Sequence, residues 1–400
     1  MHPLERRRLW FAGIGGAGVS AYAVIARAWG ADVTGWDRKE TPYLAAVREA
    51  GIPVEIADEP TFPDDREAVV STAYAERIEG MPRAEFLAEL AGLAPSIVVS
   101  GAHGKTTPAA MIAFVLERLG RDPSYAIGGE IAQLGGNARA GTGWFVVEGD
   151  ESDRTVAALP AEIAVITNLD LDHHATFGSR AEVEALFENW LAGLPEAQVV
   201  HGEELEPLAA ELAVPGEHNR RNAATALRAL ELAGVPREDA LPALAEFRGA
   251  GRRLEPRGEA GGVRVVDDYA HHPAEVAASL RAARDLAGEG RVLVLFQPHL
   301  PSRTQHLARE LAGALALADA ACVTDVYLAR EDPIPGVTGK LVAEALCETR
   351  PGMRVGWAPT PAQAVDVVAS WARPADLALT VGAGDVDAVV PELLERLETR

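Results

Sequence analysis

Apolar runs of strand length alternate with segments of helical apolar spacing from one end of the chain to the other, and this alternation constrains the fold most. The runs at residues 9–12, 96–100 and 292–296 are each followed by a segment with helical spacing. Strands that are connected through helices lie parallel in a sheet, with helices on both of its faces. The sequence therefore predicts an α/β protein built on parallel sheets.

The expected elements follow this pattern along the whole chain. The expected strands are residues 9–12, 32–35, 96–100, 144–147, 163–167, 263–266, 292–296, 321–326 and 377–381. The expected helices include one that ends near residue 29, one with Pro108 in its first turn, and residues 83–93, 180–192 and 221–232. Residues 52–66 are rich in proline and acidic side chains and give only a weak pattern.

A chain of 400 residues is longer than one hydrophobic core usually organises, so more than one domain is expected. We expect three domains, at residues 1–94, 95–250 and 251–400, with the first boundary at Ala94–Pro95. The first and third are expected to be Rossmann-like. The second is expected to be a shortened parallel sheet of the P-loop ATPase type.

Composition and charge exclude several classes of protein. The net charge of −22 opposes non-specific binding to nucleic acid and to anionic lipid. Cys322 and Cys347 fit neither a disulfide framework nor a zinc site, which indicates a reducing compartment. We see no signal peptide and no apolar stretch long enough to span a membrane. These features predict a cytoplasmic protein with no nucleic-acid or membrane partner.

The segment Gly101–Thr107 reads Gly-Ala-His-Gly-Lys-Thr-Thr and lies between an expected strand and an expected helix. In such a loop backbone N–H groups face an anion, Lys105 reaches the outer phosphates, and a threonine hydroxyl can ligate Mg²⁺. The loop lacks the first glycine of the usual pattern, since Val99 stands there. A glycine turn with a solvated lysine is the alternative, but the chain has only three lysines, and a lysine at this position is therefore unlikely to be incidental.

A second glycine-rich loop, Gly13-Ile14-Gly15-Gly16-Ala17-Gly18, follows the first expected strand, and Asp37 lies about 20 residues further on. The spacing is that of a dinucleotide-binding fingerprint. Read alone, it is compatible with NAD, with FAD, with a diphosphate at a helix N-terminus, or with a tight turn of purely structural importance.

Acidic and histidine-containing loops follow the next two expected strands. Glu148–Asp153 comes after residues 144–147, and Asn168–His174 comes after residues 163–167. Carboxylates at the carboxyl ends of parallel strands face the ligand crevice, where they can hold Mg²⁺. The alternatives are an acidic surface turn for the first loop and a histidine oriented by an aspartate for the second.

The last third of the chain repeats this arrangement. Polar loops follow three of its expected strands, at residues 267–273, 297–304 and 382–385. Seven of the ten histidines of the chain lie in strand-end loops or just before the expected helix at 221–232: His103, His173, His174, His218, His271, His272 and His299. Structural histidines would be scattered more evenly, so we expect these loops to converge on shared chemistry.

These residues together resemble the Mur ligase family of ATP-dependent, amide-forming enzymes along nearly the whole chain. The family's loop of the type G-T-H-G-K-T-T is matched by Gly101–Thr107, with Ala102 in place of threonine. The family's arginine-acid element resembles residues 251–255. Within the family, four segments resemble the members that join L-alanine to UDP-N-acetylmuramate: residues 14–18, 148–153, 267–273 and 297–299.

The resemblance implies a role for each candidate residue. ATP would be bound by Gly101, His103, Gly104, Lys105, Thr106, Thr107, His218, Asn219, Asn222, Arg253 and Asp268. The UDP-sugar would be bound by Gly15, Gly16, Ala17, Gly18, Asp37 and Ser71, with Tyr269 at the new amide. Mg²⁺ would be held by Thr106, Glu148 and His173. The residues implied in catalysis are Lys105, Glu148, His173, Arg253, His271, His299 and Arg303.

The implied reaction proceeds through an acyl phosphate. The lactyl carboxylate of UDP-N-acetylmuramate attacks the γ-phosphate of ATP, and the amine of L-alanine then displaces phosphate. Lys105, Mg²⁺ and Arg253 would offset the repulsion between the two anions. The amine must arrive deprotonated, and His174, His271 and His272 all have suitable intrinsic pKa values. The partners are thus small molecules, and the chain is expected to be a monomer or a homodimer.

Three departures from the family pattern bear on this reading. Leu300 stands where some members carry arginine, so that Arg303 alone would clamp the alanine carboxylate. Ala175 replaces an acid usually found two residues after the metal-binding histidine. The stretch between Val200 and Val214 is several dozen residues shorter than in relatives, which carry extra strands there. A ligase that recycles murein tripeptide onto the same sugar nucleotide, or a homologue that binds nucleotide without turnover, are the alternatives.

Overall fold

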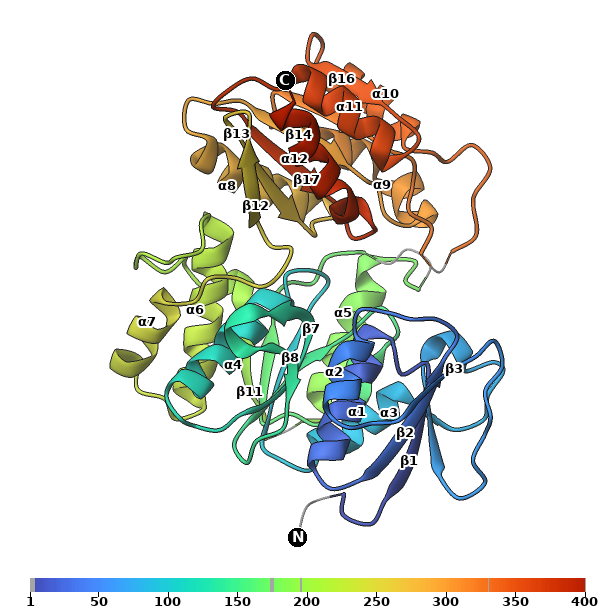
Figure 1. Ribbon diagram of the computed structural model, residues 1–400. Helices are drawn as coiled ribbons and strands as arrows, with labels where there is room; N and C mark the ends of the chain where they lie inside the picture. Colours follow the sequence, from blue (N-terminus) through green and yellow to red (C-terminus); the bar gives the residue numbers. More distant parts are fainter. Residues whose placement is uncertain (1–3, 173–175, 195, 330, 400) are drawn as a thin grey trace. The chain divides into compact units, whose positions relative to one another are not determined.

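The computed structural model describes residues 4–172, 176–194, 196–329 and 331–399, and it divides into two compact units. The first unit comprises Met1–Asp170, Ala181–Ala213 and Arg221–Ala250. The second comprises Leu171–Arg180, Val214–Arg220 and Gly251–Arg400. Figure 1 shows the chain as a ribbon coloured along the sequence. Two sheets belong to the first unit and one to the second.

The N-terminal sheet of the first unit has five parallel strands in the order β3-β2-β1-β4-β5. Its strands are β1 (Arg8–Ala12), β2 (Asp32–Asp37), β3 (Val54–Ile56), β4 (Glu67–Val70) and β5 (Met81–Pro82). Its helices are α1 (Ala17–Ala28), α2 (Leu44–Glu49), the 3₁₀ turn η1 (Thr72–Tyr74) and α3 (Arg83–Ala91).

The central sheet, also in the first unit, has the order β11-β10-β6-β9-β7-β8. Its strands are β6 (Ser96–Ser100), β7 (Ser124–Ile131), β8 (Gly136–Arg139), β9 (Phe145–Gly149), β10 (Ile163–Ile166) and β11 (Gln198–His201). The helical elements of this region of the chain are α4 (Thr106–Arg118), η2 (Ala132–Leu134), η3 (Thr155–Ala158), α5 (Arg180–Ala192), η4 (Gly202–Glu204), α6 (Glu217–Leu232) and α7 (Arg237–Ala245). Helix α1 packs against β7 and β8, which joins the two sheets of the first unit.

The sheet of the second unit has the order β12-β13-β17-β14-β15-β16. Its strands are β12 (Glu255–Ala260), β13 (Val263–Asp268), β14 (Val292–Phe296), β15 (Ala320–Val323), β16 (Arg354–Trp357) and β17 (Leu377–Val381). Its helices are α8 (Pro273–Ala287), α9 (Pro301–Leu315), α10 (Lys340–Thr349), α11 (Pro361–Trp371), η5 (Val386–Val389) and α12 (Val390–Glu398). Helices cover both faces of this sheet, and each face carries its own apolar cluster, one under α8 and α9 and the other under α11 and α12.

Strand register brings the polar loops of each sheet to one edge. In the central sheet Ser100 pairs with both Gly149 and Ile166, so β6, β9 and β10 end at the same level. In the second unit Val381 pairs with both Asp268 and Phe296, and β13, β14 and β17 also end together. Because ligands bind beyond the carboxyl ends of parallel strands, the candidate residues in the loops of these two sheets lie where a ligand can reach them.

The α/β class is confirmed, and most expected elements lie within two or three residues of their observed positions. Two differences have physical reasons. The weakly patterned stretch contains β3 and leads into β4, short strands whose packing inside a sheet outweighs their weak local pattern. The sheets are also not wholly parallel, since β8 and β12 run antiparallel to their neighbours. Both are edge strands, reached by short connections that need no helical crossover.

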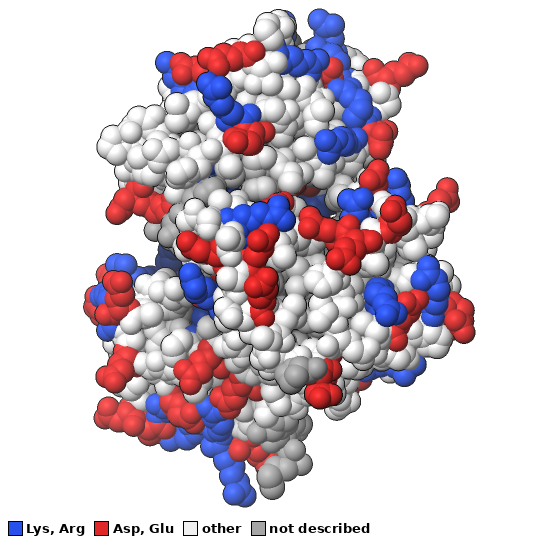
Figure 2. All heavy atoms as spheres, turned by 180° about the vertical axis from the view of Figure 1, so that it is seen from behind, with Lys and Arg blue, Asp and Glu red and all other residues white. Residues whose placement is uncertain are grey.

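The edge strand β11 is followed by residues 205–216, which carry no helix or strand and lead directly to α6. This is the stretch that the sequence marks as shortened. On the face of the molecule drawn in Figure 2, acidic and basic side chains are interspersed. Exposed ion pairs of the chain include Arg48–Glu40 and Arg77–Glu59. No helix in the described part of the chain is both long and apolar enough to cross a membrane.

Candidate active site

The glycine loop after β1 is built around Gly13 and Gly15. Gly13 has φ +79°, a left-handed conformation that favours glycine, and a Cβ there would lie 2.8 Å from the side chain of Ser71. The N–H of Gly15 donates to Asp37 at 2.8 Å, and a Cβ on Gly15 would meet the same carboxylate. The candidate residues Gly15, Asp37 and Ser71 therefore lie together.

Gly16, the N-cap residue of α1, has no side chain that could cap the helix. The backbone N–H groups of the first turn are therefore available to a ligand. Ala17 and Gly18 form the first turn of α1. An anion is stabilised at such a helix N-terminus by the N–H groups and by the helix dipole. The loop thus has the chemistry to hold a phosphate group.

The second glycine loop connects β6 to α4. Gly101 has φ +137°, and a Cβ on it would collide with Thr167 Oγ1, so only glycine fits there. Gly104 also has a left-handed φ, of +70°. The backbone between them is held by His103, whose N–H donates to Asn168 at 3.2 Å and whose Nε2 lies 2.9 Å from Asp170. The loop is therefore fixed before any ligand binds.

Lys105 contacts both a backbone carbonyl and a carboxylate of the first unit. Its Nζ donates to the carbonyl of Gly101 at 2.7 Å and pairs with Glu151 at 2.6 Å. Burial opposes the charge on the ammonium, but the carboxylates of Glu151, Asp150 and Glu148 outweigh burial and raise the pKa of Lys105. The lysine is therefore a permanent cation, held by a carboxylate until a competing anion arrives.

Thr106 and Glu148 provide oxygen ligands from two different elements. Thr106 Oγ1 donates to Glu148 at 3.2 Å, and the other carboxylate oxygen accepts the N–H of Gly128 at 2.7 Å. Mg²⁺ prefers oxygen ligands, so this pair fits that ion. The predicted ligand His173 lies outside the described residues, as does His174. Among the described residues no group of three histidine, cysteine, aspartate or glutamate side chains has the arrangement of a metal site.

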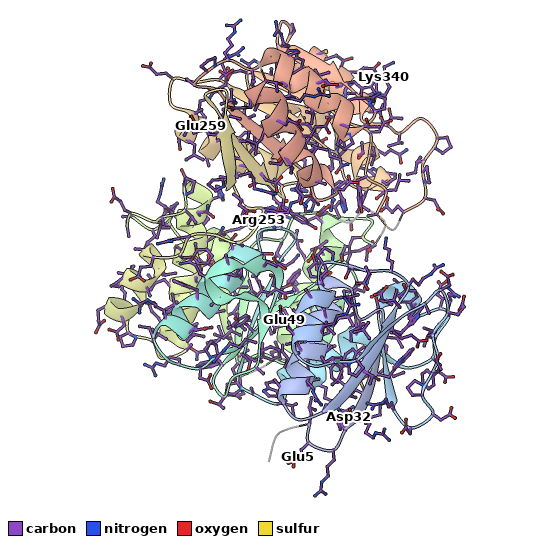
Figure 3. All side chains as sticks on the ribbon, in the orientation of Figure 1. Glu5, Asp32, Glu49, Arg253, Glu259 and Lys340 are labelled. Carbon is purple, nitrogen blue, oxygen red and sulfur yellow. The ribbon has the colours of Figure 1, made fainter. Side chains whose placement is uncertain are left out.

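In the second unit, Arg253 lies in the segment that leads into β12, and it is labelled in Figure 3. Its guanidinium lies 5.3 Å from the centre of the Tyr269 ring, and Arg252 lies 5.1 Å from the same ring. Glu275 pairs with Arg253 at 3.5 Å and accepts the backbone N–H of His271 at 3.2 Å. Glu275 thus holds an arginine and a histidine of the candidate set in place.

Asp268 is almost completely buried, and it accepts three hydrogen bonds from residues of its own unit. It accepts the N–H of Leu254 at 2.8 Å, the N–H of Ala270 at 2.9 Å and the hydroxyl of Ser279 at 2.8 Å. Burial raises the pKa of Asp268, although these donors and the Arg253 charge act in the opposite direction. The carboxylate fixes the segment around Arg253 to the end of β13.

In the second unit four rings contact one another in succession, and we call them the aromatic row: Tyr269, His271, His299 and Tyr327. Successive ring centroids are 5.5, 5.6 and 5.8 Å apart. Nδ1 of His271 lies 2.9 Å from the carbonyl of Tyr269, so a neutral His271 carries its proton on Nδ1. Nδ1 of His299 instead accepts from Arg303 at 3.1 Å, which puts the proton of a neutral His299 on Nε2.

Arg303 is bound to Asp172 through two parallel hydrogen bonds, of 2.7 and 2.8 Å, and both side chains are at most 2% exposed. Its remaining nitrogen faces His299. The prediction that Arg303 clamps the alanine carboxylate is not tested by this geometry. The geometry does show that a carboxylate of the chain already occupies the bidentate face of the guanidinium.

Two candidate histidines of the second unit are neutral at physiological pH. Burial, together with Arg253, lowers the pKa of His218 to about 4. Burial is also the main cause that lowers the pKa of His271 to about 4, with Glu275 acting in the opposite direction. A neutral His271 with Nδ1 protonated presents Nε2 as a hydrogen-bond acceptor.

The remaining candidates lie on the helices α4 and α6. Thr107 is buried in the first turn of α4. Asn219 is buried in the first turn of α6, where its side chain donates to the carbonyl of Pro215 at 2.7 Å, and Asn222 is half-buried one turn later. His218 and Asn219 belong to the second unit and Asn222 to the first.

Sequence reasoning missed four residues of these clusters as individual site residues: Glu151, Asp172, Glu275 and Tyr327. Glu151 and Asp172 lie in the loops 148–153 and 168–174, which the sequence indicates as functional, but neither residue was given a role. Glu275 had a signal, because His272-Pro273-Ala274-Glu275 has the spacing of a capping box, and the structure forms that box. Tyr327 had no local signal, since it stacks on His299 from another loop.

Sequence models of the Mur ligase family match three successive parts of this chain. The model described as "Mur ligase family, catalytic domain" matches residues 8–94, "Mur ligase middle domain" matches 99–206, and "Mur ligase, glutamate ligase domain" matches 252–384. Each of the three sheets described above has its strands largely within one of these matches.

Known proteins resemble the chain over its full length. A UDP-N-acetylmuramate–L-alanine ligase of Streptomyces avermitilis is 40% identical, covering 99% of this chain and 98% of that protein. One of Kineococcus radiotolerans is 42% identical, covering 98% and 97%. The first alignment runs over 459 residues, against 400 in this chain, so the relative carries residues that this chain lacks.

Solved structures show the same architecture. The crystal structure of the UDP-N-acetylmuramate-alanine ligase MurC from Thermotoga maritima has a TM-score of 0.80 and 26% identity, covering 98% of this chain and 99% of that one. A murein peptide ligase of Psychrobacter arcticus, at 21% identity and a TM-score of 0.67, shares the fold. With three family models in sequence and full-length relatives at about 40% identity, the chain belongs to the Mur ligase family.

Proposed function

We propose that this protein joins L-alanine to the lactyl carboxylate of UDP-N-acetylmuramate at the expense of ATP. The observation that carries the proposal is the loop Gly101–Thr107, with a half-buried, permanently charged Lys105 beside the Thr106–Glu148 oxygen pair. Full-length relatives that are named as ligases of these two substrates support the choice of substrates.

The first step joins two anions, and the first unit supplies the positive charge for it. The lactyl carboxylate attacks the γ-phosphorus, the bond to the bridging oxygen breaks, and ADP leaves with an acyl phosphate formed. Lys105 neutralises charge on the transferring group while the N–H groups of residues 101–107 orient the other phosphates. His103, Gly104 and Thr107 keep this loop in the shape that those contacts require.

Thr106 and Glu148 fit Mg²⁺, and we propose that they hold it, with His173 as the third ligand. A bound Mg²⁺ supplies charge neutralisation between phosphate oxygens. The N–H of Gly128 fixes the orientation of the Glu148 carboxylate, so the position of one ligand is set by the backbone of β7.

The second step requires a neutral amine, and the second unit has the groups for it. The amine nitrogen attacks the acyl carbon, the bond to phosphate breaks, and the proton that the nitrogen loses passes to the departing phosphate. We propose that Nε2 of His271 accepts a hydrogen bond from the amine, while Nε2–H of His299 donates to an oxygen at the reacting carbon. Tyr269 borders the same aromatic row. Arg253 is assigned to a phosphate oxygen and Arg303 to the alanine carboxylate.

The remaining assignments follow the three expected domains, at 1–94, 95–250 and 251–400. We assign UDP to the loop with Gly15, Gly16, Ala17 and Gly18, together with Asp37 and Ser71. We assign the adenosine part of ATP to His218, Asn219, Asn222 and Asp268. Three donors leave one of the four lone-pair sites of the Asp268 carboxylate, and this assignment gives that site to a ribose hydroxyl. The reaction is placed in the cytoplasm, where ATP is available.

The test is a phosphate-release assay. Purified protein with Mg-ATP should release phosphate only when both UDP-N-acetylmuramate and L-alanine are present. In the Lys105→Ala variant the rate should fall by about 10²–10³, the usual cost of removing a positioned group that stabilises transition-state charge. Unchanged activity in this variant would refute the assignment of the loop.

Lys340→Ala is the matched control for that variant. Lys340 is an exposed lysine of α10 that pairs with Glu344 at 3.4 Å on the helix surface. Its removal should leave the rate of phosphate release unchanged. Loss of activity in both variants would indicate a general effect of lost charge and not a role for the loop.

The murein tripeptide is the alternative acceptor, and the fold shared with a murein peptide ligase keeps it in view. L-alanine and the tripeptide are compared as amine substrates at equal concentration. Faster phosphate release with the tripeptide would replace the proposed activity by a recycling one. Binding of both nucleotides without release of phosphate under any condition would identify a homologue without turnover.

A further inference from the structure

Arg83, the first residue of α3, lies where three loops of the first unit meet. Its Nη1 would lie 3.1 Å from a Cβ placed on Gly18, so the guanidinium contacts the first turn of α1. Its Nε donates to the hydroxyl of Thr72 at 3.0 Å. Its Nη2 pairs with Asp153 and lies 3.7 Å from Asp150.

Asp150 and Asp153 belong to residues 150–155, which we call the acidic loop. The loop is tied internally, because Asp150 accepts the N–H of Ser152 at 2.9 Å and Asp153 accepts the N–H of Thr155 at 3.1 Å. Glu151, the partner of Lys105, stands between these two turns. One short loop is therefore held by two cations, Arg83 on the side of α1 and Lys105 on the side of α4.

Both of these cations belong to sites for phosphate. Lys105 is the lysine of the ATP loop, and Arg83 lies against the glycine at which the diphosphate of the sugar nucleotide is proposed to bind. The side chain of Arg83 is 19% exposed and that of Lys105 is 16% exposed, so each can be reached by a ligand. Tyr22, which also borders Gly18, adds no negative charge, because burial raises the pKa of its phenol to about 12.

We propose that the two cations exchange their carboxylate partners for phosphates in a linked manner, and that Arg83 is the residue that links them. A diphosphate at Gly18 competes with Asp153 for Arg83. When Asp153 is displaced, the acidic loop loses its ion pair with Arg83, and the hold of Glu151 on Lys105 weakens. The γ-phosphate of ATP can then replace Glu151 as the partner of Lys105 more easily. This inference rests on the proposed sites for the sugar nucleotide and for ATP.

Linked exchange predicts positive cooperativity between the two ligands. Each should tighten the binding of the other by the same factor, because coupling between binding sites is reciprocal. We expect a factor of about 10, within the range of 5–150 that such couplings typically reach. The measurement is calorimetric titration of Mg-AMP-PNP with and without saturating UDP-N-acetylmuramate, and of UDP-N-acetylmuramate with and without Mg-AMP-PNP.

Two variants separate this linkage from a merely structural role. Arg83→Gln removes the cation, so UDP-N-acetylmuramate should bind more weakly and the tenfold coupling should disappear. Asp153→Asn removes only the competing charge and keeps an oxygen for Thr155. It should bind UDP-N-acetylmuramate more tightly than the wild type, again with reduced coupling. A structural role would weaken binding in both variants.

Arg7→Gln is the control. Arg7 pairs with Glu89 on the same helix α3, at the end remote in sequence from Arg83, and also with Glu67. This variant should keep the wild-type coupling. If Arg83→Gln does not fold, as judged by circular dichroism, the opposite sign expected for Asp153→Asn still decides the question.

The possible failures are distinguishable. Wild-type protein that does not bind UDP-N-acetylmuramate at all would contradict the proposed function. Wild-type protein that binds both ligands independently would overturn the linkage and leave the proposed function intact. Coupling that persists in Arg83→Gln, or weaker sugar-nucleotide binding in Asp153→Asn, would likewise overturn it.

Discussion

The pair Lys105–Glu151 of the first unit and the pair Arg303–Asp172 of the second both lie near strand ends, and the two pairs differ in construction. In the first unit the Lys105 ammonium meets Glu151 through a single contact, and the lysine side chain is 16% exposed. In the second unit Arg303 and Asp172 share two parallel hydrogen bonds, and neither is more than 2% exposed. A single flexible contact suits exchange with a ligand, whereas a bidentate buried one suits permanence.

The surroundings of the pairs differ in the same sense. Near Lys105 the neighbouring groups are charged, and the carboxylates around it keep its pKa raised. Arg303 lies beside the ring of His299 in the aromatic row, and burial lowers the pKa of His271 in the same row to about 4. Lys105 stays charged because carboxylates surround it, whereas His271 stays neutral because it is buried. The surroundings of Lys105 in the first unit are therefore suited to binding an anion, whereas the aromatic row of the second unit is suited to directional hydrogen bonds with neutral groups.

The largest effect is expected from breaking the permanent pair. Asp172→Ala leaves the Arg303 guanidinium buried with no carboxylate, and the free energy of unfolding should fall by about 3–5 kcal/mol. Urea denaturation followed by circular dichroism measures this loss. The exposed pair Asp366–Arg396 provides the control, since Asp366→Ala should cost less than about 1 kcal/mol. Equal losses would mean that burial does not distinguish these pairs.

Breaking the exchangeable pair should cost less. In Glu151→Ala the Lys105 ammonium keeps the carbonyl of Gly101 and can turn toward solvent along its flexible stem. We expect a loss of about 1–3 kcal/mol in the free energy of unfolding, as for a buried polar group that loses one partner. The same urea titration measures it. A loss as large as that of Asp172→Ala would remove the proposed difference between the two units.

The neutral histidines predict a pH-dependent loss of stability. His218 and His271 take up a proton near pH 6.5 in the unfolded chain but only near pH 4 in the folded one. The unfolded state therefore binds more protons between these values, and stability is lost as the pH falls from 6.5 toward 4. At pH 5 the loss should be about 2 kcal/mol for each histidine relative to pH 7.

His271→Gln tests this expectation, because glutamine does not titrate. The free energy of unfolding of the variant should decline less between pH 7 and pH 5 than that of the wild type. An identical decline in the two proteins would show that His271 remains as easily protonated in the folded chain as in the unfolded one.

Local patterns were enough to predict the class of the fold and the loops that carry the candidate residues. The apolar runs set the strands, and a loop that follows a parallel strand must lie at the carboxyl edge of the sheet. The capping-box spacing at His272–Glu275 was equally readable, although Glu275 was not assigned a role. All of these signals lie within a few neighbouring residues.

Pairings between distant segments could not be predicted in the same way. Asp172 and Arg303 are 131 residues apart, and Lys105 and Glu151 are 46 apart. The sequence contains many acidic residues that could pair with Lys105 or Arg303. Which of them does so depends on side-chain packing within the fold. The antiparallel edge strands β8 and β12 escaped prediction because a short connection leaves little helical pattern to read.

The segment of residues 205–216, beyond the edge strand β11, offers a place for inserting a label. The strand is an edge strand, and residues 205–216 leave it without helix or strand and lie largely at the surface. A full-length relative carries residues that this chain lacks, so the fold accepts different amounts of polypeptide. Surface segments of this kind tolerate insertion. A fluorescent protein or an affinity peptide placed after Glu206 would therefore label the enzyme internally while both glycine loops keep their sequence.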